Sequence, residues 1–342
     1  MGDGEFDLIK SLRESLRLRR LDSARGLVEG VGDDAAVLRQ SSQLDTVITT
    51  DLLVEGIDFK LTGDADSDAS IVGRRAVAVS LSDVAAMGAR PRWLLLSVGL
   101  PRKLWRRGFA RALVSNAMAY AADFGVALVG GDISRTPERV VVDSIVVGEV
   151  RRGRAVLRSG AQVGDQIFVT GSLGGAAKGL MILEGGRVRR SKDYESAERG
   201  LVARQQQPTP RVEWGATLGE RRLASAMIDL SDGLSSDLAH LCRESRVGAR
   251  VEAASLPLDP LLGSAGTACD DALSLALHGG EDFELLFTVS ERNARRLPSQ
   301  LGGVRATRIG EVTRERGKVR LVRDGRARLL RPGGFEHFGR DG

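Results

Sequence analysis

The stretch VITTDLLVEGIDF, residues 47–59, starts as a β-strand and becomes acidic towards its end. Its first residues are apolar, β-branched or threonine, a composition that strands favour. Three carboxylates follow, on Asp51, Glu55 and Asp58, and the stretch contains no lysine or arginine. Because burying an unpaired carboxylate costs several kcal/mol, the acids at the end of a buried strand need cations from elsewhere. Of the three, we expect Glu55 to lie at the surface.

The same pattern recurs along the chain, with an acid directly after an apolar segment or beside glycine. The further acids are Asp33 and Asp34 in GVGDDAAVL, Asp83 in SLSDVAAMGA, Asp132 in LVGGD, Asp229 and Asp232 in MIDLSDG, and Glu281 and Asp282 in HGGED. Any one of these acids is explained as a turn or helix-capping residue. Because so many of them share this local pattern, we favour a fold in which their side chains converge on shared cations. Mg²⁺ takes oxygen ligands and commonly bridges carboxylates to phosphate oxygens. The three histidines show no ligand spacing, which argues against zinc.

Length and composition indicate two domains of ordinary size. The chain has 342 residues, of which 42% are hydrophobic and only 4% aromatic, so its cores must rest on aliphatic side chains. The formal charge is +5, and short arginine clusters at 17–20, 151–154 and 187–190 would suit a nucleic acid. These clusters are scattered, interrupted by acids and poor in aromatic neighbours. We therefore interpret them as solvated surface and expect no nucleic-acid partner.

Cysteine content and hydropathy bear on the location of the protein. Cys242 and Cys269 are too few for a disulfide framework, which fits a reducing compartment. The first ten residues have no apolar signal core, and no apolar run approaches the roughly 18 residues of a membrane helix. We therefore expect a cytoplasmic protein with no membrane partner.

Strands and helices alternate without a strict β-α-β rhythm, which predicts an α+β fold of two mixed domains, residues 1–150 and 151–342. In the first half we expect strands at 45–51, 92–101, 126–132 and 139–150, and helices at 69–87 and 103–124. In the second half we expect helices at 175–184 and through Leu234, Leu238 and Leu241, a strand at 225–233, and a basic strand pair near the C-terminus after the segment 277–289. The polar stretch RQQQPTP, residues 204–210, is typical of a linker or surface loop.

The familiar nucleotide-binding motifs are missing or misplaced. GSLGGAAKG, residues 171–179, is similar to a phosphate-binding loop, but Ala177 stands where the Walker A pattern needs glycine. DFG at 123–125 falls at the end of a predicted helix and has no HRD motif or VAIK lysine beside it. The sequence also has no GxSxG elbow and no GxGxxG after a strand, which argues against hydrolase and Rossmann functions.

Taken in order, the motifs resemble those of bacterial thiamine-monophosphate kinases, in the superfamily of aminoimidazole ribonucleotide synthetase. The matching segments are GEFDLI, GVGDDAAVL, TTDLLVEGIDF, LSDVAAMGARP, LVGGD, RSGAQVGDQIFVTG, IDLSDGLSSDL, GGEDFELLFT and GFEHF, which span nearly the whole chain. Each motif is weak by itself, but the ordered set is specific. The resemblance implies ATP-dependent conversion of thiamine monophosphate to thiamine diphosphate with several Mg²⁺ ions. It also implies the two-domain fold of that superfamily and a homodimer formed through the N-terminal domains.

The resemblance assigns roles to individual residues. It implies metal ligands at Asp34, Thr49, Thr50, Asp51, Asp83, Asp132, Asp229 and Asp232. It implies ATP contacts at Gly131, Asp132, Arg158 and Ser231, with Asp132, Arg158 and Asp232 as the catalytic set, and a thiamine site lined by Asp58, Glu281 and Phe335. Three positions depart from the family pattern: Asp58 stands where histidine is frequent, Ser80 where asparagine is usual, and Phe335 where tryptophan or tyrosine can occur.

A phosphate acceptor explains why the sequence has no recognisable general base. The second pKa of a phosphate monoester is near 6, so its oxygen is already anionic at pH 7 and suits direct in-line transfer. Two alternatives stay open. One is another ATP-dependent enzyme of the superfamily that phosphorylates an amide or carboxylate oxygen, and the more distant one is a basic nucleic-acid-binding protein.

Overall fold

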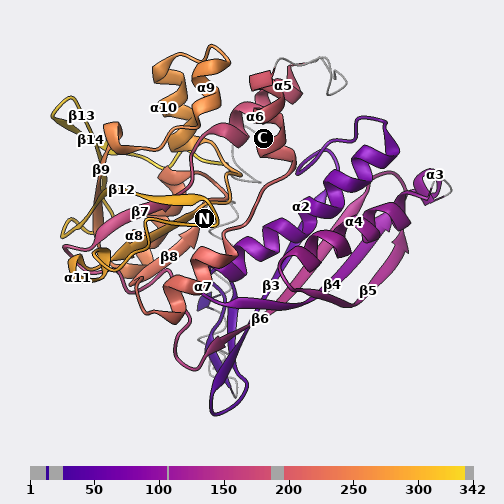
Figure 1. Ribbon diagram of the computed structural model, residues 1–342, viewed down its shortest axis with the longest axis horizontal. Helices are drawn as coiled ribbons and strands as arrows, with labels where there is room; N and C mark the ends of the chain where they lie inside the picture. The colour runs from indigo at the N-terminus through magenta and orange to yellow at the C-terminus, as the bar shows by residue number, and fades with distance from the viewer. Residues whose placement is uncertain (1–12, 15–25, 106–107, 186–195, 336–342) are drawn as a thin grey trace.

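Two β-sheets organise the chain into two lobes (Figure 1). The computed structural model describes residues 13–14, 26–105, 108–185 and 196–335. The N-terminal lobe, indigo to magenta in Figure 1, lies to the right of the C-terminal lobe, which runs from magenta to yellow. None of the helices in these ranges combines the length and the apolar character that crossing a membrane would require.

Six strands form the N-terminal sheet in the order β1-β2-β3-β6-β4-β5. Their bounds are Leu27–Glu29 (β1), Ala36–Arg39 (β2), Leu44–Val54 (β3), Arg90–Leu100 (β4), Ala127–Arg135 (β5) and Val141–Arg151 (β6). Neighbouring strands are antiparallel except β4 and β5, which run parallel. Because β2 pairs with β3 only up to Ile48, the second half of β3 has no strand neighbour on that side within the described residues.

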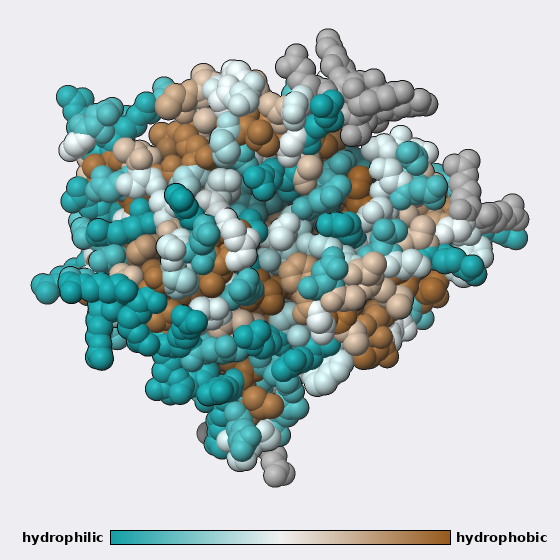
Figure 2. Space-filling model, viewed as in Figure 1, coloured by the Kyte–Doolittle hydropathy of each residue, from teal (hydrophilic) through white to brown (hydrophobic). Residues whose placement is uncertain are grey.

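Helices cover one face of this sheet. They are α2 (Ala65–Ala86), α3 (Arg102–Trp105) and α4 (Phe109–Asp123). Residues alternate between the faces of each strand, so Val47 of β3 and Val142 of β6 pack with α2 in one core. The opposite face carries apolar side chains that stay partly exposed, with Leu52 at 60% and Trp93 at 38%. On the side that Figure 1 shows, hydrophobic and hydrophilic residues are interspersed at the surface of this lobe (Figure 2).

The C-terminal sheet runs β14-β13-β9-β12-β7-β10-β8, with β11 paired to β12. Its strands are Gln166–Thr170 (β7), Ala226–Asp229 (β8), Gly248–Glu252 (β9), Leu285–Val289 (β10), Gln300–Leu301 (β11), Val304–Thr313 (β12), Val319–Arg323 (β13) and Arg326–Leu330 (β14). The helices of this half are Gly175–Glu184 (α5), Ser196–Gln206 (α6), Val212–Glu220 (α7), Leu234–Ser245 (α8), Ala253–Ser255 (η3), Pro260–Ser264 (α9), Cys269–His278 (α10) and Glu291–Ala294 (α11). β8 is the edge strand, and the turn after Asp229 leads into α8.

The two lobes share hydrophobic contacts around α2. Ala85 and Ala86, at its C-terminal end, pack in one cluster with Trp214 and Phe287 of the C-terminal half. Phe283 of the C-terminal half in turn joins the core of the N-terminal lobe. The end of α2 is therefore fixed against β8, so that acids from both lobes can meet there.

Most of the predicted elements are present, and the differences have local causes. The helix predicted at 103–124 is divided into α3 and α4, because Gly108 adopts a left-handed conformation (φ 75°) before α4 begins. α2 starts at Ala65, earlier than predicted, since the Asp64 carboxylate caps it by accepting from the N–H of Ser67 at 3.4 Å. The prediction of a linker or loop at 204–210 is wrong for its first three residues, which complete α6.

Candidate active site

A cavity of about 1280 Å³ lies between the lobes and contains most of the predicted site residues. The N-terminal lobe lines it with the turn before β2, the second half of β3 and one side of α2. The C-terminal lobe lines it with Arg158, α5, the turn after β8, residues 279–283 and residues 333–335. The edge of β3 that β2 leaves uncovered opens onto this space.

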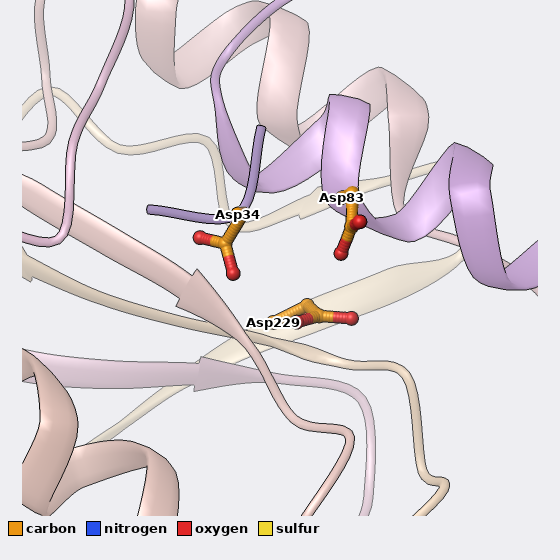
Figure 3. A group of neighbouring side chains, drawn as sticks. All are labelled: Asp34, Asp83 and Asp229. Atoms are coloured by element: carbon orange, nitrogen blue, oxygen red, sulfur yellow. The ribbon is translucent and has the colours of Figure 1, made fainter. Parts of the chain in front are cut away.

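Three aspartates converge beside the cavity, as Figure 3 shows. Asp34 comes from the turn before β2, Asp83 from α2 and Asp229 from the end of β8. Each offers a carboxylate oxygen, and these oxygens lie within 4.8 Å of one another. The sequence positions span both halves of the chain, so the site exists only when the lobes are packed together.

A hydroxyl donor holds each carboxylate that comes from β3, α2 or β8. Ser82 donates to Asp229 at 2.7 Å, and Thr49 donates to Asp83. Asp51 joins the group through Ser80, which donates to its carboxylate at 2.6 Å. The hydroxyl of Ser80 therefore orients the carboxylate of Asp51.

Arg158 supplies the nearby positive charge. Its guanidinium donates to Asp34 Oδ1 from Nη2 at 2.6 Å and from Nε at 3.2 Å. Its backbone N–H also donates to the carboxylate of Asp33, at 3.0 Å for the shorter bond. The second oxygen of Asp34 is buried and has no hydrogen-bond partner. One guanidinium cannot balance four clustered carboxylates, so the site retains an excess of negative charge.

The pKa values of the clustered acids reflect this excess. Burial, followed by the charge of Asp34, raises the pKa of Asp229 to about 8. Burial and neighbouring acids likewise raise the pKa of Asp51 to about 6, although the Ser80 hydrogen bond opposes the shift. The pKa values of Asp34 and Asp83 are raised as well, with burial as the main cause in both. Each shift arises because ionisation would add charge to a buried, already acidic site.

The residues fit a hard divalent cation. The ligand atoms are carboxylate oxygens, which Mg²⁺ prefers. The buried second oxygen of Asp34, which accepts no hydrogen bond, is available to bind a cation. A bound cation would offset the repulsion that raises the acids' pKa values. Of the predicted metal ligands, the structure brings together Asp34, Asp51, Asp83 and Asp229, with Thr49 beside them.

Thr50 and Asp132 lie apart from this cluster. Thr50 is on the opposite side of β3 from Thr49, and its hydroxyl donates to Asp143 at 2.8 Å. Asp132 lies on β5, three strands from β3 in the sheet order, and its register partner Ser97 pairs in turn with Asp143 on the face that the helices leave open. Neither Asp132 nor the adjacent Gly131 lines the cavity of this chain.

Gly131 has a conformational reason to be glycine. Its φ of +153° is rarely adopted by other residues, and a Cβ there would lie 2.0 Å from the carbonyl oxygen of Leu96. The close contact of β5 with β4 explains this residue without a ligand.

Ser231 and Asp232 form the turn between β8 and α8 and line the cavity. The carboxylate of Asp237, in the first turn of α8, accepts from the N–H of Asp232 at 3.2 Å and of Gly233 at 3.0 Å. The carbonyl of Ser231 accepts from the N–H of Glu281 at 2.8 Å. The turn is thus fixed on both sides, and it links the cluster to the segment that carries Glu281.

The predicted thiamine residues lie around the same cavity. Asp58 lines it while its carboxylate accepts from the N–H of Val54 at 2.7 Å. Phe335 lines it with 55% of its surface exposed, and its N–H donates to the carbonyl of Asp232 at 3.2 Å. Glu281 also lines it, in a left-handed conformation with φ +68°. The exposure of Phe335 argues against an ordinary core position for its ring.

The segment similar to a phosphate-binding loop has another partner. The carboxylate of Asp282 accepts from the N–H groups of Gly174 at 2.7 Å and Ala176 at 3.2 Å, at the start of α5. These donors would otherwise attract an anion to the helix N-terminus. An internal carboxylate therefore occupies the position of a phosphate, in agreement with the failed Walker A match.

Comparison with known proteins identifies the family. The model for "AIR synthase related protein, N-terminal domain" matches residues 32–150, and the model for the C-terminal domain matches residues 162–322. Thiamine-monophosphate kinase of Escherichia coli K12 is 40% identical over 99% of both chains. The chain belongs to the thiamine-monophosphate kinase family.

Solved structures of the family agree with this assignment. AaThiL complexed with AMPPCP and TMP is 31% identical, with a TM-score of 0.82 over 98% of this chain and 97% of that chain. Thiamine-monophosphate kinase from Stenotrophomonas maltophilia is 36% identical, with a TM-score of 0.75 over 92% and 96%. Three predictions are thereby confirmed: the family resemblance, the fold of two mixed domains, and the enzyme class of a thiamine-phosphate kinase.

The structure also reveals cavity residues that the motifs do not indicate. Arg75 and Gln205 line the cavity beside Glu281, and the histidines His240 and His278 line it as well. A signal for Arg75 is present in the sequence, because it interrupts the apolar run of a predicted helix. Gln205 gives no such signal, since it belongs to a stretch whose composition is typical of a loop.

Glu55 differs from its prediction as a surface residue. It is half-buried, and its carboxylate accepts from the N–H of Val140 at 2.8 Å. It therefore closes the end of the β3–β6 pair instead of facing solvent or a ligand.

Proposed function

We propose that this enzyme transfers the γ-phosphoryl group of ATP directly to the phosphate of thiamine monophosphate, giving thiamine diphosphate. The observation that carries the proposal is one cavity bordered by two kinds of side chain. Four aspartates and Arg158 converge beside it, and an exposed ring and a fixed carboxylate line it as well. The relative AaThiL was solved with an ATP analogue and TMP, which supports the same pair of substrates here.

The aspartate cluster would hold Mg²⁺ and the nucleotide phosphates. We expect Asp34, Asp51, Asp83 and Asp229 to bind the metal, and we extend the set to Thr49 and Asp232 as predicted. Several Mg²⁺ ions, when bound, would neutralise the phosphates that must approach each other. Arg158 is the cation beside this cluster, and it pairs with Asp34. We expect its guanidinium also to donate to a phosphate oxygen of the nucleotide.

Positioning accounts for the remaining chemistry. The acceptor phosphate carries its own anionic nucleophile, so the chain need only orient it in line with the γ-phosphoryl group and exclude water. We expect Ser231, next to Asp232 in the turn that these hydrogen bonds fix, to contact the nucleotide. Phe335 offers a ring face to the cationic or aromatic parts of thiamine, and Asp58 and Glu281 offer acceptors.

One reaction tests the proposal. The protein is incubated with MgATP and thiamine monophosphate, and the products are separated by chromatography with thiamine diphosphate as the reference. We expect thiamine diphosphate and ADP in equal amounts. ADP release only with an amide or carboxylate substrate would favour another member of the superfamily. Salt-sensitive retardation of nucleic acid without any ADP release would favour the nucleic-acid-binding alternative.

We further propose a homodimer formed through the open face of the N-terminal sheet. That face carries Ile48, Leu52, Trp93 and Ile145, partly exposed apolar residues that a second copy would bury. The same face carries Asp132, which has no access to the cavity of its own chain. Pairing of two sheets would bring Asp132 towards Thr50 of the other copy, which lines that copy's cavity, and so towards the metal site.

The dimer is tested by measuring the mass in solution and the activity of two variants. Leu52→Glu should shift the mass in solution from dimer to monomer and abolish activity. Thermal unfolding of this variant, measured without ATP, should stay cooperative. Asp132→Asn should lose activity by orders of magnitude without changing the mass. A fully active monomeric Leu52→Glu variant would refute the shared site.

We also propose a domain boundary near residues 150/151 and a cytoplasmic location. The boundary is supported by the sheets, because the strands of the first lie within residues 27–151 and those of the second within 166–330. Limited proteolysis should cut first between the lobes. The location is supported by the cysteine content and is tested by cell fractionation.

A further inference from the structure

We infer that Arg75 is a positioning residue for the acceptor site, acting through Glu281. Arg75 belongs to α2, and only 1% of its side chain is exposed. Its Nη2 forms an ion pair with Glu281 Oε1, and its Nη1 donates to the backbone carbonyl of Gln205 at 2.6 Å. A buried arginine is costly unless it is paired, so this arrangement must be maintained by its partners.

Two elements hold the carboxylate of Glu281 from two directions. Arg75 holds Oε1 from α2, and Gln205 Nε2 donates to Oε2 at 3.2 Å from the end of α6. The backbone carbonyl of the same Gln205 accepts from Arg75, so the three residues form a closed set. A charge-assisted hydrogen bond of this kind is strong and directional, so it fixes the direction of the carboxylate.

The backbone of Glu281 supports the assignment. Its φ of +68° is a conformation that residues with side chains rarely adopt, and such strain persists where the surroundings impose it. On either side, Asp282 caps α5 and Phe283 is buried in the N-terminal core. Successive side chains of this segment therefore point to different partners, and the strained conformation is what directs Glu281 to the cavity and to Arg75.

Electrostatics indicate what the fixed carboxylate recognises. Arg75 neutralises most of the charge of Glu281, so the pair offers an oriented acceptor with little net negative charge. Since 27% of the Glu281 side chain remains exposed towards the cavity, its free lone pairs can accept from an N–H donor. Resting on the proposed function, we assign this acceptor to the amino group on the pyrimidine of thiamine monophosphate, whereas the cationic thiazolium is left to the ring of Phe335.

Kinetics of matched variants test the inference. Arg75→Met removes the donors while keeping an apolar stem, and Arg75→Lys restores one charged donor. The control is Arg74→Met, because Arg74 is the neighbouring residue of α2 but lies over the ring of Tyr120, 4.5 Å from its centroid, and outside the cavity. KM for thiamine monophosphate, KM for ATP, kcat and the melting temperature are measured for each.

We expect Arg75→Met to raise KM for thiamine monophosphate at least tenfold and to leave KM for ATP within twofold. Arg75→Lys should recover most of that loss, and Arg74→Met should resemble the unmodified enzyme. When Glu281→Gln is already present, Arg75→Met should change KM for thiamine monophosphate by less than twofold. Arg75 acts through the Glu281 carboxylate, which that variant lacks.

Three results would overturn the inference. They are an unchanged KM for thiamine monophosphate in Arg75→Met, equal changes of both KM values, and effects of Arg75→Met and Glu281→Gln that multiply independently. If Arg75→Met does not fold, Arg75→Lys combined with Glu281→Gln supplies the same cycle. An unmodified enzyme that makes no thiamine diphosphate would defeat the proposed function and this inference together, whereas an active one with an indifferent Arg75 would defeat the inference alone.

Discussion

Replacing Asp229 with asparagine should stabilise the metal-free protein while abolishing its activity. The side chain is 3% exposed, and burial together with the charge of Asp34 raises its pKa from 3.8 to about 8. A raised carboxyl pKa means that the folded chain holds a proton that the unfolded chain has lost. The stability of the metal-free protein must therefore fall as the pH rises from about 4 to about 8, and it is lowest above that window.

The size of the effect follows from the same shift. Four pKa units correspond to roughly 5 kcal/mol of unfavourable free energy for the ionised Asp229 at pH 8.5. The repulsion is shared with the other acids of the cluster, and asparagine keeps an acceptor for the 2.7 Å bond from Ser82. We therefore expect a net gain of about 2 kcal/mol, or a rise in melting temperature of about 3–6 °C.

Thermal melts in EDTA at pH 5 and pH 8.5 measure this gain. It should be large at pH 8.5 and much smaller at pH 5, where the folded wild-type carboxyl is already protonated. With saturating Mg²⁺ at pH 8.5 the order should reverse, because only the wild-type site keeps its full charge for the metal.

The matched control is Asp68→Asn. Asp68 is also buried, but its carboxylate is surrounded by hydrogen-bond donors instead of other acids. The carboxylate of Asp68 accepts from the N–H of Thr62 at 2.9 Å, from the hydroxyl of Thr62 at 2.8 Å and from the N–H of Gly63 at 3.0 Å. Its replacement should lower the melting temperature at both pH values. If Asp229→Asn in EDTA at pH 8.5 loses as much stability as Asp68→Asn, the argument from clustered charge is refuted.

Three further outcomes are expected. Tight ATP binding should require Mg²⁺, since the acids repel phosphate without it, and calorimetry that finds equally tight binding in excess EDTA would contradict this. Phe335→Ala should raise KM for thiamine monophosphate more than KM for ATP, by roughly the 0.5–2 kcal/mol of a cation–ring contact, whereas equal rises would assign the ring to the fold. Free thiamine should be a very poor substrate, in kcat as well as KM, because its neutral hydroxyl lacks the negative charge and the phosphate oxygens that metal ions would bind. Comparable kcat/KM values for the two acceptors would instead indicate a hydroxyl kinase.

Local sequence was sufficient to predict the elements that carry the site and the family to which it belongs. β3 follows from the apolar β-branched start of residues 47–59, and α2 from a long run of small and aliphatic residues. The acids could be recognised as a set because each follows an apolar segment or glycine. These are short-range signals, set by the preferences of neighbouring residues, and one chain is enough to show them.

Which acids meet was decided by the tertiary structure alone. Asp83 and Asp229 share a site because the end of α2 packs against the C-terminal lobe, a contact between residues that are far apart in the chain. Asp132 has the same local pattern, yet the strand order places β5 three strands away from β3. The contact between Arg75 and Glu281 likewise joins two lobes, through a backbone conformation that no local preference favours. Strand order and lobe packing arise from many weak long-range contacts, so motifs could nominate these residues while only the folded chain could bring them together or keep them apart.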